Sequence, residues 1–152
     1  MLTPTPAGHW IAIVLQIADR DALPVEVIAP TLAKLGVAQA DAFISCWSTK
    51  FKYNLLRPVT YIKRHIDKAW EPLLITPPFP EYTSGHSTQS GAASTVLTAV
   101  FGDNFAFDDE THVDEGLPVR SFPSFAAAAA SLGAESWMVS SVGADELGER
   151  AI

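Results

Sequence analysis

The chain has 152 residues, of which 48% are hydrophobic and 18% charged, enough for one domain with an apolar core. The formal net charge of −7 argues against general nucleic-acid binding, so we expect no nucleic-acid partner. The single cysteine, Cys46, excludes an internal disulfide framework. No run of about 18 apolar residues occurs, so we expect no membrane span. Residues 1–6 lack the features of a signal peptide, which leaves localisation open.

Helical periodicity dominates the first third of the chain. Apolar residues recur at helical spacing from residue 8 to residue 22. Pro24 suits the first turn of a second helix, which we expect to end at the stop signal of Gly36. Pro30 lies inside this second helix and is expected to kink or split it.

The segment 37–53 is the clearest predicted helix. Four of its residues follow the i, i+3, i+4, i+7 pattern of one face: Phe43, Cys46, Trp47 and Lys50. Lys50 therefore shares the apolar face, where a lysine either extends to the rim or is buried against an anion. Arg57 follows two turns later and adds a second cation, which favours the anion.

The rest of the chain also favours helices. Helices are predicted over 59–70, 87–100 and 125–132, and a last one over 144–152, with a proline-rich loop over 71–83. Residues 103–120 are acidic and irregular, and we expect them to form an exposed loop. No alternating strand pattern exceeds four residues. The sequence therefore predicts an all-α helical bundle.

Basic residues are concentrated in one short stretch of this acidic chain. Six of the ten lie between positions 50 and 68: Lys50, Lys52, Arg57, Lys63, Arg64 and Lys68. A local positive field of this size suits a small oxyanion better than a long polyanion. For the four other than Lys50 and Arg57, a solvated helix face is the favoured explanation of the charge.

The tripeptide Ser84-Gly85-His86 lies between the proline-rich loop and a predicted helix. A helix start offers free backbone N–H groups to an oxyanion. Ser84 is a candidate donor or an N-cap, and Gly85 permits close backbone approach or a turn. His86 is a candidate acid–base residue or a loop histidine that caps the helix. The four histidines of the chain do not show zinc-ligand spacing.

Taken together, Lys50, Arg57-Pro58 and Ser84-Gly85-His86 resemble the first two motifs of one superfamily. It comprises the vanadium-dependent haloperoxidases and the type-2 phosphatidic acid phosphatases. Further stretches resemble its bacterial haloperoxidase-like branch: Cys46-Trp47, Tyr53-Asn54, Phe79-Pro80-Glu81-Tyr82, Gly102-Asp103-Asn104 and Arg120-Ser121-Phe122. The resemblance covers residues 8–133 and corresponds to the C-terminal part of a longer helical protein. We therefore expect residues 1–152 to be one haloperoxidase-like domain, present as a fragment.

The resemblance implies a pocket for vanadate, with phosphate as competitor or alternative. Lys50 and Arg57 would neutralise the oxygens of the anion, Ser84 and the Gly85 backbone would donate hydrogen bonds, and His86 would be the acid–base residue. Hydrogen peroxide and a halide would be the other partners, and a homo-oligomer stays open. Fixed donors around a trigonal-bipyramidal centre are common to both activities of the superfamily.

The third motif of the superfamily, Ser-Arg and five residues later His, is missing. Counted from Ser136, its arginine position holds Trp137 and its histidine position holds Gly143. No histidine follows His112, which lies in the acidic loop. Thr83 also replaces the usual proline. The replacement of proline by Thr83 is a minor departure, whereas the missing third motif predicts impaired activity. Two alternatives remain: an acid phosphatase on the same pocket, or a non-catalytic helical domain.

Overall fold

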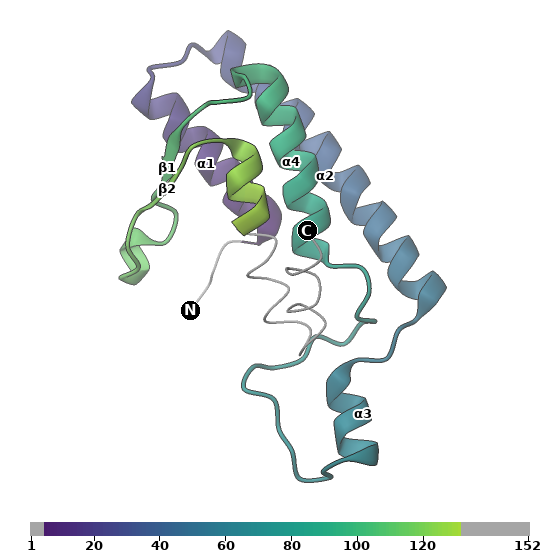
Figure 1. The fold of residues 1–152 in the computed structure, drawn as a ribbon. Helices are drawn as coiled ribbons and strands as arrows, with labels where there is room; N and C mark the ends of the chain where they lie inside the picture. Colours follow the sequence, from purple (N-terminus) through teal and green to yellow (C-terminus); the bar gives the residue numbers. More distant parts are fainter. Residues whose placement is uncertain (1–4, 132–152) are drawn as a thin grey trace.

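The computed structural model describes residues 5–131. The elements are α1 (Pro6–Arg20), α2 (Val25–Tyr53), α3 (Pro58–His65), α4 (Gly85–Phe101), β1 (Phe107–Asp109), the 3₁₀-helix η1 (Val113–Glu115) and β2 (Arg120–Phe122). Residues 125–131 are also helical. Helices α1, α2 and α4 pack against one another, whereas α3 lies at the far end of α2 (Figure 1). The fold is mostly helical, which confirms the all-α prediction.

Helix α2 is longer than the sequence predicted. It runs without interruption through Pro30 and Gly36, so the predicted stop at Gly36 is wrong. A glycine inside a helix costs only about 1 kcal/mol relative to alanine, and packing along α4 outweighs it. The end of the helix is where the sequence placed it, because Asn54 adopts a left-handed conformation with φ of 46°.

Helix α3 is shorter than predicted and ends at His65 rather than at residue 70. The chain turns there because the backbone N–H groups of Ile66 and Asp67 both donate to the Ile62 carbonyl. The Asp67 carboxylate then accepts from the Ala69 N–H at 2.9 Å, which stabilises the turn. Residues 71–83 form the predicted loop, which brings the chain back to the start of α4.

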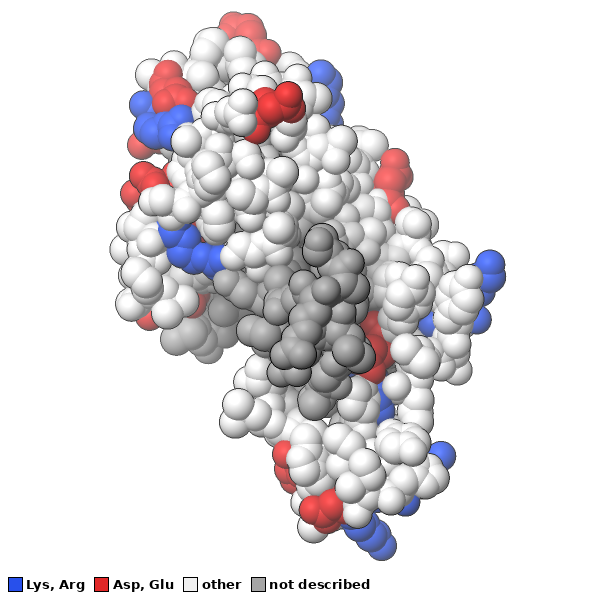
Figure 2. Space-filling model, in the orientation of Figure 1, with Lys and Arg blue, Asp and Glu red and all other residues white. Residues whose placement is uncertain are grey.

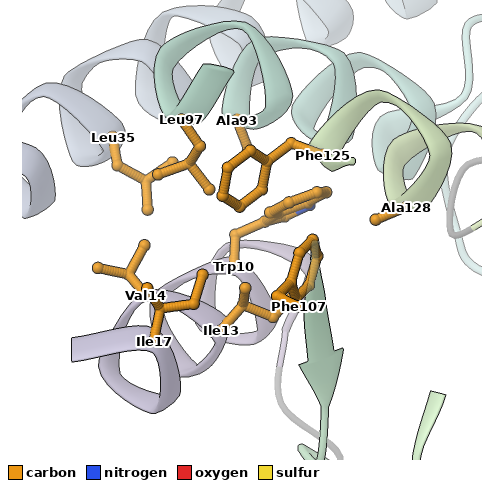
Figure 3. Close-up of a cluster of buried hydrophobic side chains, with 10 residues drawn as sticks. All are labelled: Trp10, Ile13, Val14, Ile17, Leu35, Ala93, Leu97, Phe107, Phe125 and Ala128. Atoms are coloured by element: carbon orange, nitrogen blue, oxygen red, sulfur yellow. The ribbon is translucent and has the colours of Figure 1, made fainter. Parts of the chain in front are cut away.

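The core is a cluster of buried apolar side chains between α1, α2, α4, β1 and residues 125–131 (Figure 3). Its members are Trp10, Ile13, Val14, Ile17, Leu35, Ala93, Leu97, Phe107, Phe125 and Ala128. The Trp10 Nε1–H donates to the Ser90 hydroxyl at 3.1 Å, so the buried indole has its polar partner. This bond fixes the first turns of α1 beside the first turns of α4.

The acidic segment 103–120 is only partly exposed. Strands β1 and β2 within and beside it pair antiparallel, with Phe107 opposite Phe122. Phe107 belongs to the core and Asp109 is buried, which an exposed loop would not allow. The sequence did not predict these strands, because each has only three residues, too few for an alternating apolar and polar pattern to stand out.

Figure 2 shows charged side chains along the edges of the visible face, with Lys and Arg gathered near the end of α2 and over α3. Within residues 5–131, one stretch, Val25–His65, is long and apolar enough to cross a membrane by length and composition, and an 18-residue window in it has a mean hydropathy of 1.3. Core helices and signal sequences meet the same criterion, so this is weak evidence. The absence of a membrane span stays a prediction.

Candidate oxyanion site

One cavity of about 570 Å³ lies where three helices begin. Its wall includes the starts of α1 at Thr5, of α3 at Arg57 and of α4 at Ser84. Each helix start carries a partial positive charge of about half an elementary charge. At α1 and α4 one N–H is already capped by a side chain, since Thr5 accepts from Gly8 and Ser84 accepts from Ser87. Three such starts on one cavity create a field that favours an anion.

All five site residues predicted from the sequence line this cavity: Lys50, Arg57, Ser84, Gly85 and His86. They come from three separate parts of the chain, which are the last turn of α2, the start of α3 and the start of α4. The structure thus brings Lys50 and Arg57 together with Ser84, Gly85 and His86 on one cavity. The roles of these residues stay predictions.

Lys50 is buried, with an exposed fraction of 2%. Its ammonium donates to the Pro80 carbonyl at 2.9 Å and to the Glu81 carbonyl at 2.7 Å. Burial lowers the pKa of Lys50, and the charge of Arg57 lowers it further, whereas the Glu81 carboxylate acts in the opposite direction. An ammonium has three donors, so two carbonyls leave one N–H for a ligand.

Arg57 is the N-cap residue of α3 and is 7% exposed. Its Nε–H donates to the Phe79 carbonyl at 2.6 Å. Burial lowers the pKa of this guanidinium, although a group with so high an ordinary pKa keeps its charge. Together with Lys50, Arg57 ties the loop before Ser84 to the end of α2. The two cations therefore hold the cavity wall in place and also give the cavity its positive charge.

The start of α4 presents a hydroxyl and a glycine to the cavity. Ser84 is the N-cap, and its Oγ accepts from the Ser87 N–H at 3.2 Å and from the Ser87 hydroxyl at 3.0 Å. The hydroxyl hydrogen of Ser84 thus remains available to a ligand. A Cβ on Gly85 would lie 3.2 Å from the Trp47 ring, so any larger residue would have to displace the ring by a few tenths of an ångström.

His86 follows in the first turn of α4. The residue as a whole is exposed, but the cavity wall partly buries its imidazole. This burial lowers the pKa of His86 from its ordinary value of 6.5, and the charge of His9 lowers it further. The ring is therefore neutral at pH 7 and has one nitrogen that accepts and one that donates a proton.

Several lining residues were not predicted as site residues. Phe43, Trp47 and Phe79 form an aromatic wall, and Gln89 joins it from α4. Gln89 was predictable in principle, because it lies three residues after His86 on the same helix face. The residues at the start of α1 gave no signal, since only tertiary packing brings them to the cavity.

A buried pair lies beside the site. His9 on α1 donates to the Asp109 carboxylate at 2.8 Å, and Asp109 also accepts from the Thr111 N–H at 3.1 Å. The ring of His112 packs edge-on against His9, with centroids 5.1 Å apart. His112 is not among the residues that line the cavity. The positions Trp137 and Gly143 lie outside the described residues.

Comparisons with known proteins support the resemblance. Residues 31–138 match the family model described as the VCPO second helical-bundle domain. The search of solved structures found the crystal structure of the first bacterial vanadium-dependent iodoperoxidase, at 54% identity and a TM-score of 0.80. This match covers 90% of the present chain but only 33% of the iodoperoxidase chain. No curated protein matched. The chain therefore belongs to the VCPO second helical-bundle domain family and is a vanadium haloperoxidase-like helical domain.

Proposed function

We propose that this domain binds vanadate in the cavity as a prosthetic group, and that the site belongs to a haloperoxidase in which hydrogen peroxide oxidises a halide. The observation that carries the proposal is the convergence of three helix starts with buried Lys50 and Arg57 on one cavity. Iodide is the halide we propose, because the similar solved structure is named an iodoperoxidase.

The residues present fit a tetrahedral oxyanion. Lys50 and Arg57 supply positive charge, and the Ser84 hydroxyl and first-turn N–H groups of α4 supply hydrogen-bond donors. His86, neutral at pH 7, can accept a proton from a ligand oxygen or return it. Bound vanadate would supply the activation of hydrogen peroxide for attack by the halide. The protein would contribute fixed charge, donors and the proton.

The test is thermal unfolding of the chain with and without vanadate or phosphate. Either anion should raise the melting temperature, because a ligand that binds only the folded state stabilises it. Arg57→Ala should abolish the shift. Arg64→Ala is the matched control, since Arg64 is an exposed arginine on α3 outside the cavity lining. An unchanged melting curve at millimolar vanadate would favour the non-catalytic alternative.

Activity assays separate the remaining alternatives. Oxidation of iodide by peroxide with vanadate present would support the haloperoxidase, and hydrolysis of a phosphate ester without vanadate would support the phosphatase. We expect both rates to be very low, because the third-motif arginine and histidine are absent at Trp137 and Gly143. The double variant Trp137→Arg with Gly143→His should raise the haloperoxidase rate if that absence is the cause.

A further inference from the structure

Helix α2 has an apolar face that is exposed in the described part of the chain. Its other side packs against α1 and α4 (Figure 1), and that side carries the buried residues of the helix. On the exposed face, Val37, Ile44 and Phe51 are 64%, 66% and 62% exposed. Single exposed apolar residues are common on protein surfaces, but a continuous row of large ones is typical of an interaction surface.

These residues have the spacing of a coiled-coil seam. Val37, Ile44 and Phe51 recur every seven residues, which is close to two turns of an α-helix. Two exposed small residues, Ala40 and Ser48, lie between them at steps of three or four residues. The five side chains therefore form one narrow strip in which large and small residues alternate. Such a strip fits the side of another helix, whose large side chains occupy the gaps above the small ones.

The strip is complementary to a second copy of itself in the antiparallel orientation. When two α2 helices lie antiparallel with their overlap centred near residue 46, Phe51 of one protomer lies opposite Ala40 of its partner. In the same register Ile44 of one protomer lies opposite Ser48 of its partner. Two-fold symmetry makes each of these contacts occur twice. A large side chain thus meets a small one at all four positions.

The same register places opposite charges next to each other beside the strip. Asp41 and Lys52 lie on one flank of it, 11 residues apart, and both are exposed. Neither forms an ion pair within residues 5–131. In the antiparallel register Asp41 of each protomer lies beside Lys52 of its partner, so two ion pairs form. A parallel pairing would instead place each charge beside an equal one. Lys34 lies on the same flank but beyond the overlap.

From this complementarity we infer that two copies of the chain form an antiparallel dimer through the exposed face of α2, with Asp41 of each protomer paired to Lys52 of the other. The inference does not depend on the proposed function, because none of these residues lines the cavity. The overlap of residues 37–53 is about 25 Å long, so the interface is small and the dimer should dissociate on dilution.

Sedimentation equilibrium from micromolar to millimolar concentration measures the dissociation constant of the dimer. Ile44→Glu should raise this constant at least about tenfold, because it places two carboxylates near the centre of an apolar contact. Ile66→Glu is the matched control, since Ile66 is a 72% exposed isoleucine that follows α3 and lies outside α2. The control should dimerise like the unaltered chain.

Exchange of the two charges tests the register. Asp41→Lys alone and Lys52→Asp alone should each weaken the dimer about tenfold, because each creates two pairs of like charges. The double variant with both substitutions should regain the affinity of the unaltered chain, since its ion pairs are only reversed. A loss of folded structure would not produce this recovery.

Cross-linking of the unaltered chain needs no variant. A carbodiimide joins a carboxylate directly to an amine, and mass spectrometry should find Asp41 bonded to Lys52 in the dimer. Within one helix these residues lie about 16 Å apart, too far for such a bond, so the product must join two chains. A chain that stays monomeric at every concentration would overturn the inference and leave the face to a helix of a different protein. A dimer without this cross-link, or one that Ile44→Glu leaves unchanged, would overturn it as well.

Discussion

The imidazole of His9 and the carboxylate of Asp109 lie 2.8 Å apart, although 100 residues separate them in the sequence. The side chains are 12% and 2% exposed, so the pair is largely shielded from water. Burial alone would raise the pKa of Asp109, but the hydrogen bonds from His9 and Thr111 prevail and lower it to about 2. This pair ties β1 to α1 beside the cavity.

The first prediction concerns acid stability. A carboxyl group whose pKa is lower in the folded chain contributes stability that is fully present above its unfolded pKa of about 4. That stability is lost as the pH falls through about 2. Asp109→Asn should therefore remove about 2 kcal/mol of unfolding free energy at pH 7. Urea unfolding of both chains between pH 7 and pH 2 measures this loss of unfolding free energy.

In the Asp109 variant the unfolding free energy should depend less on pH between 4 and 2 than in the unaltered chain. Asp103→Asn serves as control, because Asp103 is exposed and should change the unfolding free energy by less than about 0.5 kcal/mol. Identical pH profiles for the two variants would contradict the buried pair.

The second prediction compares two glycines of α4. Gly85→Ala would place a Cβ 3.2 Å from the Trp47 ring, so the ring must shift, at a cost of about 1 kcal/mol. Gly91→Ala meets no atom within 4 Å and should stabilise the helix by about 0.5–1 kcal/mol. Urea unfolding should thus give opposite signs for the two substitutions. The same sign for both would show that the contact with Trp47 is unimportant.

The third prediction compares two lysines of α2. Lys50→Met removes the buried charge and its bonds to the Pro80 and Glu81 carbonyls. The affinity for phosphate, measured by calorimetry, should fall at least tenfold, since a charged hydrogen bond contributes about 1.5–3 kcal/mol. Lys52→Met removes an exposed charge two residues later and should change the affinity little. Equal affinities in all three chains would exclude Lys50 from the anion site.

The fourth prediction concerns the imidazole of His86. Burial and the charge of His9 both lower its pKa, so it should titrate below 6.5 in the folded chain. His9→Gln keeps a donor for Asp109 but removes the charge, and should raise the pKa of His86. His65→Gln alters an exposed histidine on α3 and is the control. NMR titration of the histidine resonances across pH 5–8 gives the pKa of His86 in each chain. An unchanged pKa of His86 in the His9 variant would contradict the electrostatic effect of His9 on His86.

Most of the helices and the five candidate site residues could be predicted from the sequence alone. Helical periodicity is a local property, and so are the caps at Ser84 and Asn54 that set where α4 begins and α2 ends. The position of Lys50 on an apolar helix face left open whether its ammonium reaches the rim or is buried, and the structure buries the side chain at 2% exposure.

The length of α2 and the surroundings of the site depend on tertiary packing and could not be predicted. Gly36 is a stop signal in isolation, but packing against α4 outweighs a local cost of about 1 kcal/mol. The start of α1 and the His9–Asp109 pair reach the site through contacts across 80 to 100 residues. Such contacts leave no periodic trace in the sequence, because burial and hydrogen bonding depend on which elements meet, not on their neighbours along the chain.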